Sequence, residues 1–270
     1  MKPLSHSIVK GPESKADNLC MIVHGILGAG MNLRSVARSL HEQFPQWWFV
    51  LPDLRAHGKS DSYDGPHTVD ECANDLLSLE RELGAAARLR IGHSFGGKVV
   101  LAAGRKYSAT TVLMDTLPGA TTQADPSRKW MNSLIGALAA VPMPLESRDQ
   151  LGAALGPYGK DPMFIGWMGT NLRREPGFTG LFWRFNLHVI GQLIEDYWEQ
   201  EMSEWLEDTA SPAFVLYGEK SGRFTPEALK DIESAIGDRL RQIPGAGHWV
   251  HVDNPNATIG RLGEIMRLLQ

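Results

Sequence analysis

Several features that mark other classes of protein are scarce or absent in this sequence of 270 residues. It holds only two cysteines, Cys20 and Cys72, which excludes a disulfide framework and predicts two reduced thiols in the core. No run of about 20 apolar residues occurs that could span a membrane, and the first residues lack the apolar segment of a secretory signal. These absences predict a cytoplasmic protein with no integral membrane segment, although an organelle protein after removal of a transit peptide would look the same.

The chain also lacks a large excess of positive or negative charge: no basic run occurs, and the net charge is only −4. Such a balance argues against a nucleic-acid partner. The nine histidines and two cysteines show no metal-ligand spacing. We therefore expect no metal and no cofactor. The 43% of apolar residues is enough for an ordinary globular core that needs no disulfide or structural metal.

Short apolar runs alternate with helical periodicity in the first and last thirds of the chain. Runs that predict strands are residues 20–23, 47–51, 89–92, 110–114, 213–217 and 240–243. Between them lie amphipathic patterns, such as the one that begins at the capping box of Thr68 and Glu71 and stops at Gly84. This alternation predicts an α/β fold with a mostly parallel central sheet and helices on both faces.

The interval 117–208 breaks this alternation. It holds five of the eight tryptophans, clustered glycines and prolines, and helical patches, but no β-rich run. We interpret it as a helical lid inserted into a core made of residues 1–116 and 209–270. An insertion after the carboxyl end of a strand lies over the active-site edge of an open α/β sheet.

The pentapeptide Gly92-His93-Ser94-Phe95-Gly96 lies between a predicted strand and a helix-forming run. This is the G-x-S-x-G nucleophile elbow, in which a strand turns sharply into a helix and leaves one hydroxyl exposed at the sheet edge. Glycines flank the serine because the turn leaves no room for a Cβ. Ser94 is therefore the candidate nucleophile.

His248 is the candidate base, because it follows the last predicted strand in a glycine-rich loop and comes after the serine in chain order. We expect the nearby His251 to be structural. His93 is expected to point away from the serine and to brace the turn.

Two carboxylates are candidates for orienting His248. Asp115 ends the predicted strand at 110–114, and Glu219 lies in the loop after the strand at 213–217. Many hydrolases place an aspartate in that second loop, where this chain has Ser221. We favour Asp115 and keep Glu219 as the alternative.

Backbone amides suit an oxyanion hole because they are fixed before charge develops. The segment 24–28 follows the first strong strand, and we expect one donor from Ile26, with Leu27 as the alternative, and the other from Phe95. Leu27, Trp183 and Trp249 are expected to line the substrate pocket. The other tryptophans of the interval are expected to be mostly lid core.

Two further motifs imitate nucleotide sites. Gly28–Leu33 resembles a dinucleotide fingerprint but has Leu33 where the third glycine belongs. Gly92–Lys98 matches the start of a phosphate-binding loop. The next residue is Val99 and not the serine or threonine whose hydroxyl binds magnesium in such loops. Asp53, Arg55 and His57 are interpreted as a hydrogen-bonded turn near the elbow.

Taken together, these motifs resemble the α/β-hydrolase superfamily over nearly the whole chain, in particular the YbfF-type esterases and their eukaryotic relatives. The matching segments are 24–28 (HGILG) with 32–33 (NL), 52–60 (PDLRAHGKS), 92–98 (GHSFGGK), 183–187 (WRFNL) and 245–251 (GAGHWVH). The resemblance implies hydrolysis of carboxyl esters or thioesters without a cofactor and a lid between strands six and seven. It also implies an acid after the sixth strand, which supports Asp115.

The expected partner is a small acyl ester or thioester. A ligand receptor on a hydrolase scaffold and a carbon–carbon hydrolase or lyase with the same triad remain alternatives. Neither the natural substrate nor the oligomeric state follows from the sequence.

Overall fold

The computed structural model describes residues 3–270, so the first two residues of the expected core segment 1–116 lie outside the described part. A seven-stranded sheet has the order β1-β3-β2-β4-β5-β8-β9, with only β1 antiparallel to its neighbour. Its strands are β1 (His6–Val9), β2 (Leu19–Val23), β3 (Trp48–Pro52), β4 (Ala87–His93), β5 (Thr110–Met114), β8 (Ala213–Gly218) and β9 (Leu240–Ile243). The predicted mostly parallel sheet is confirmed. β1 was not predicted, because its four half-buried residues show no clear apolar pattern.

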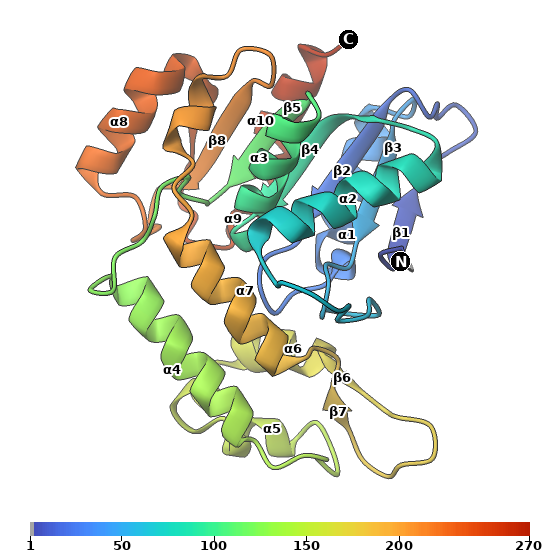
Figure 1. Ribbon diagram of the computed structural model, residues 1–270, viewed down its shortest axis with the longest axis vertical. Coiled ribbons are helices and arrows are strands. Elements are labelled where there is room, and N and C mark those ends of the chain that lie inside the picture. The colour runs from blue at the N-terminus through green and yellow to red at the C-terminus, as the bar shows by residue number, and fades with distance from the viewer. Residues whose placement is uncertain (1–2) are drawn as a thin grey trace.

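Helices cover both faces of the sheet, as expected (Figure 1). One face carries α2 (Val69–Leu83), α3 (Phe95–Lys106) and α8 (Pro226–Ile236), whose apolar residues join one core cluster. The opposite face carries α1 (Arg34–Gln43) and α10 (Pro255–Arg267), which share a second cluster. The short helix α9 (Val250–Asp253) precedes α10. Both clusters pack against strands that are buried on their two faces, which explains their continuous apolar runs.

Local sequence signals set the ends of α2. Thr68 Oγ1 accepts a hydrogen bond from Glu71 N at 3.1 Å, and Gly84 ends the helix with a φ of 66°. The Glu71 carboxylate accepts from Asn74 Nδ2 at 2.9 Å. The predicted start and stop of this helix are confirmed, but the capping box is only half formed, because the Glu71 carboxylate bonds Asn74 and not the Thr68 amide.

The interruption of the sheet falls between β5 and β8, the fifth and sixth of its strands in chain order within residues 3–270. The expected position between strands six and seven is therefore wrong for this chain, because that numbering came from the resemblance and not from its own strands. The intervening elements are α4 (Pro126–Ala140), α5 (Gln150–Ala154), α6 (Pro162–Thr170), β6 (Leu172–Arg173), β7 (Phe182–Trp183) and α7 (Leu187–Glu199). β6 and β7 form a small antiparallel pair that was not expected.

Figure 1 shows α4 to α7 gathered at one end of the molecule, below the sheet in that view. Both ends of this insertion are attached to α3 by the fully buried Lys98. Its ammonium donates to the carbonyl oxygens of Gly119, Tyr197 and Gln200 at 2.8, 2.9 and 2.8 Å. Lys98 therefore serves the packing of the insertion and not a phosphate-binding loop. Within residues 3–270, no helix has both the length and the apolar character needed to cross a membrane.

Candidate active site

Ser94 occupies a strained turn between β4 and α3. Its φ of 52° and ψ of −119° lie outside the regions that side-chain-bearing residues normally adopt. A Cβ on Gly92 would lie 2.1 Å from the Gly96 carbonyl oxygen, and a Cβ on Gly96 would lie 2.6 Å from the His24 carbonyl oxygen. The two glycines of the pentapeptide are thus required by close backbone approach. The turn leaves the Ser94 hydroxyl facing a cavity.

Loops far apart in sequence bring three polar side chains into one hydrogen-bonded chain. Ser94 Oγ lies 3.1 Å from His248 Nε2, and His248 Nδ1 lies 2.7 Å from Asp115 Oδ2. With Nδ1 donating to the carboxylate, Nε2 is left as the acceptor for the Ser94 hydroxyl proton.

Asp115 is completely buried at the end of β5 and has a φ of 50°. Its Oδ1 accepts from Gly218 N at 2.9 Å, and its Oδ2 accepts from Ser221 Oγ at 2.7 Å. Burial raises the pKa of Asp115, while these two hydrogen bonds oppose the rise. Ser221, at the place where many hydrolases have the acid, therefore holds the carboxylate of the candidate acid Asp115.

Glu219 lies in the same loop as Ser221 but points elsewhere. Its Oε2 accepts a hydrogen bond from Gly245 N at 2.6 Å. The structure thus places Asp115, and not Glu219, against His248.

The loop that carries His248 is fixed by a second histidine. His93 Nε2 donates to the His248 carbonyl oxygen at 2.9 Å, and the two rings are 4.8 Å apart. His93 therefore braces the His248 loop, a role that the sequence did not indicate. Burial lowers the pKa of His248 well below its ordinary value, with Arg223 and His251 adding to the effect. A neutral imidazole is the form that can accept a proton.

Two buried imidazoles interlock the segment 24–28 with the turn that follows β3. His57 Nε2 accepts from Leu27 N at 3.1 Å, and His24 Nε2 accepts from Leu54 N at 3.0 Å. Burial lowers the pKa of His57 to about 3 and that of His24 to about 4, so both rings are neutral acceptors at neutral pH. Asp53 holds the same turn by accepting from Gly30 N and Lys59 N. The expected hydrogen-bonded turn is therefore present.

These contacts bear on the two candidate oxyanion donors. Because the Leu27 amide already donates to His57, the alternative that it serves as donor loses support. Ile26 lines the cavity beside Ser94, and Phe95 is the first residue of α3. Within residues 3–270, neither the Ile26 amide nor the Phe95 amide donates a hydrogen bond to a backbone carbonyl. A helix N-terminus with free amides favours negative charge nearby.

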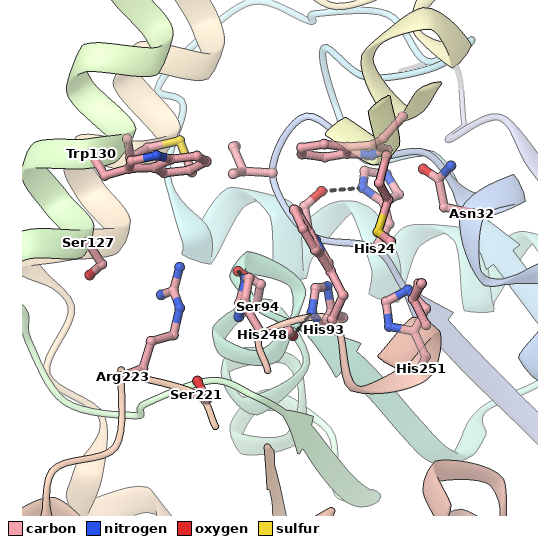
Figure 2. A pocket seen from close by; sticks show the side chains of 18 of the residues that line it. His24, Asn32, His93, Ser94, Ser127, Trp130, Ser221, Arg223, His248 and His251 are labelled. Atoms are coloured by element: carbon pink, nitrogen blue, oxygen red, sulfur yellow. Dashed lines mark hydrogen bonds between the residues drawn. The ribbon is translucent and has the colours of Figure 1, made fainter. Parts of the chain in front are cut away.

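The cavity above Ser94 has a volume of about 760 Å³ and is lined by both the sheet loops and the insertion. Trp130 and Trp167 of the insertion border it, together with Trp249, which follows His248 in the chain. Figure 2 shows Ser94, His93 and His248 together, with Arg223, Ser127 and Trp130 on one side and His24, Asn32 and His251 on the other. The cavity therefore combines a broad aromatic wall with a few polar groups, as ligand sites do.

Two residues expected in this pocket do not line it. Leu27 is fully buried in the core, where the interlocked loop holds it. Trp183 lies in β7 and stacks on Phe185 at a ring distance of 4.9 Å. Neither is among the residues that border the cavity, so these two expectations are corrected.

Sequence reasoning also missed two residues around the site. Arg223 borders the cavity from the loop after β8. Asn171, which follows α6, donates from Nδ2 to the Leu27 carbonyl oxygen at 2.8 Å. A lone polar residue in a loop gives no local pattern, so neither could be found by periodicity or spacing. In residues 3–270, no group of three or more His, Cys, Asp or Glu side chains is arranged to hold a metal ion.

Comparisons with known proteins agree with this architecture. The alpha/beta hydrolase family matches residues 21–261, and the chain belongs to that family. It is 25% identical to the sn-1-specific diacylglycerol lipase ABHD11 of Mus musculus, over 94% of this chain and 81% of that protein. It is 26% identical to the esterase YbfF of Escherichia coli K12, over 88% of this chain and 89% of that protein.

Solved structures show the same fold. An esterase from a marine microorganism superposes with a TM-score of 0.84 at 24% identity, covering 97% of this chain and 98% of its own. The E-2-(acetamidomethylene)succinate hydrolase superposes with a TM-score of 0.74 at 21% identity, covering 92% and 91%. The family and its esterase members place the chain among enzymes of the hydrolase class.

Proposed function

We propose that this protein is a serine esterase that hydrolyses carboxyl esters or thioesters of small to medium acyl groups. The observation that carries the proposal is the hydrogen-bonded chain from Ser94 Oγ through His248 to the buried Asp115 at the base of the cavity. Relatives described as a lipase and an esterase act on acyl esters, which supports the same bond type here.

In this proposal His248 Nε2 takes the proton of Ser94 Oγ as that oxygen attacks the acyl carbonyl. The amides of Ile26 and Phe95 hold the oxyanion, and Asp115 keeps His248 in the tautomer that can accept a proton. His248 then passes the proton to the leaving alcohol or thiol. Water repeats the sequence on the acyl-enzyme and releases the acid.

The insertion has a role in the same proposal. Residues 1–116 and 209–270 form the catalytic core, and residues 117–208 act as a lid that shields the acyl-enzyme from bulk water. Residues of α4 and α6 border the cavity directly, which supports this role. A cytoplasmic location, catalysis without a cofactor and a small-molecule partner remain predictions.

The proposal is tested with Ser94→Ala on chromogenic esters of graded acyl length and on acyl thioesters. We expect turnover to fall by about 10⁴–10⁶-fold, because removing the nucleophile of a triad disables the whole unit. Covalent labelling by a fluorophosphonate should disappear in the same variant. Wild-type rates in Ser94→Ala would refute the assignment, and binding without repeated turnover would favour the ligand-receptor alternative.

A further inference from the structure

The cavity contains one half-buried arginine, Arg223, that forms no ion pair with a carboxylate in the described part of the chain, although its charge helps to lower the pKa of Asp125. The buried arginines elsewhere are all paired: Arg55 with Asp75 at 2.7 Å, Arg90 with Glu80 at 2.7 Å, and Arg128 with Glu195 at 2.9 Å. Arg223 forms no ion pair within 4.0 Å among residues 3–270. It borders the cavity, and Figure 2 shows its side chain rising beside Ser94 toward Ser127 and Trp130.

The groups around Arg223 leave its guanidinium available. Asp125 also borders the cavity, but its Oδ1 accepts from Ser127 N at 2.7 Å and from Ser127 Oγ as the cap of α4. Asp115 is committed to His248 and Ser221. The Tyr197 hydroxyl interacts with Arg223 but carries no charge at neutral pH. A guanidinium has five donors in a planar fork, so donors remain for a ligand.

The position of Arg223 ties it to the reacting groups. Its charge adds to the lowering of the pKa of His248 and opposes the rise in the pKa of Asp115, so it lies within electrostatic reach of each. Much of the remaining wall is aromatic, with Trp130, Trp167 and Trp249, and polar residues such as Asn32 and Ser127 also border it. A ligand that fits both features has an apolar body and one anionic end.

The geometry points to Arg223 as the subsite for a carboxylate carried by the ester substrate. This inference rests on the proposed esterase function and names its substrate class, which is the ester of an acyl group that ends in a carboxylate. A carboxylate fits better than a doubly charged phosphate, because Arg223 is half-buried while Lys220, the other cation that borders the cavity, is exposed, and Asp125 lies on the same wall. Planar guanidinium and carboxylate groups also pair through two parallel hydrogen bonds.

The test compares esters of equal chain length that differ in charge. Mono-p-nitrophenyl adipate is paired with p-nitrophenyl hexanoate, and the glutarate and suberate half-esters are paired likewise with pentanoate and octanoate. The measured quantity is the ratio of kcat/KM for the anionic ester over the neutral ester. A change in the pKa of His248 affects both esters alike, so the ratio isolates binding of the carboxylate.

Arg223→Gln should lower this ratio by about 10-fold or more for the best-fitting pair, as expected for loss of a charge-assisted hydrogen bond. Arg223→Lys should give an intermediate ratio, because the charge remains but the fork is lost. Lys220→Gln is the matched control, since it removes a positive charge from the same cavity. Its ratio should change less than about 3-fold if the guanidinium acts by contact and not through the general potential.

Three outcomes overturn the inference while the esterase function stands: an unchanged ratio in Arg223→Gln, an equal fall in Lys220→Gln, or stronger inhibition by inorganic phosphate than by free adipate. Hydrolysis of both esters that persists in Ser94→Ala would instead refute the proposed function, and the inference with it. A lowered ratio in Arg223→Gln alone, with weakened inhibition by adipate, supports the carboxylate subsite.

Discussion

At the scale of single residues, Asp115 and Glu219 differ in what surrounds each carboxylate. Asp115 is buried and accepts hydrogen bonds from Gly218 N, Ser221 Oγ and His248 Nδ1. Glu219 bonds the exposed amide of Gly245. A buried carboxylate with three donors is held in one orientation, which is what an imidazole needs from its partner.

Asp115→Asn should lower kcat by about 10³–10⁴-fold, because the amide donates to Nδ1 and forces the wrong tautomer of His248. Glu219→Gln is the matched change in the neighbouring loop and should stay within about 3-fold of wild type, since it touches only a loop amide. Steady-state rates on one chromogenic ester decide between them. The opposite pattern would transfer the role of the acid to Glu219.

At the scale of elements, the segment 24–28 depends on two loops that are remote in sequence. Its Leu27 amide donates to His57, and its Leu27 carbonyl accepts from Asn171 of the insertion. The adjoining Ile26 amide is the proposed oxyanion donor. The insertion thus helps to position the segment 24–28 as well as lining the cavity, because the peptide groups before and after Leu27 are each held by a hydrogen bond.

Asn171→Ala removes one of these two restraints. We expect kcat to fall by about 10-fold with little change in KM, because an oxyanion donor acts in the transition state and small displacements weaken it. The free energy of unfolding should drop by about 1–2 kcal/mol from the lost buried hydrogen bond. Kinetics and urea unfolding of the same preparation separate the two effects.

Asn18→Ala is the control for this change. Asn18 Nδ2 also donates to a backbone carbonyl, that of Gln46, but precedes β2 at the end of the sheet opposite the site. It should lose stability without losing kcat. A loss of kcat in Asn171→Ala no larger than that in Asn18→Ala would show that Asn171 has only a structural role.

At the scale of the whole molecule, Lys98 joins the insertion to the sheet core. Its three carbonyl acceptors belong to the two segments where the chain enters and leaves the insertion. The ammonium also lies 4.5 Å from the centre of the Tyr197 ring. Three donors meeting three acceptors compensate the burial of the charge, and the contacts fix how the insertion sits over α3.

Lys98→Ala should lower the free energy of unfolding by about 2–4 kcal/mol, because it leaves buried carbonyls without a donor and a cavity beside α3. Lys106→Ala, on the same helix, removes a partly exposed ammonium bound to Asp70 and Asn74 and should cost less than about 1 kcal/mol. Urea unfolding gives both values, and limited proteolysis within 117–208 reports on the insertion. Equal costs for the two variants would contradict the role of Lys98.

Much of the core could be predicted because its signals are local. The strands at 110–114 and 240–243 have the predicted limits, and the N-cap Thr68 and the stop at Gly84 act within α2 itself. The strained elbow at Ser94 was equally readable, since its pentapeptide is a local pattern and Gly92 is required by the nearby carbonyl of Gly96, although Gly96 itself is required by the distant His24 carbonyl. A buried strand, a helix cap and a tight turn each depend on neighbours in sequence.

Other features could not be predicted, because they depend on partners far along the chain. Leu27 was expected in the pocket, yet its amide and carbonyl are both held by distant loops and its side chain is in the core. Trp183 is a large aromatic residue of the kind that often lines a pocket, but its ring stacks on Phe185. No residue near Arg223 in sequence indicates that it lines a cavity. Only the folded insertion brings Ser127 and Trp130 to the same cavity.

The sequence by itself determined the alternation of strands and helices, the elbow at Ser94 and the order of the polar residues along the chain, since periodicity and turn chemistry are properties of short segments. Only the tertiary structure decided which carboxylate meets His248, which amides remain free beside Ser94, and which cation faces the cavity. Those choices arise where loops from separate strands converge at one sheet edge, and distance in space is not encoded in spacing along the chain.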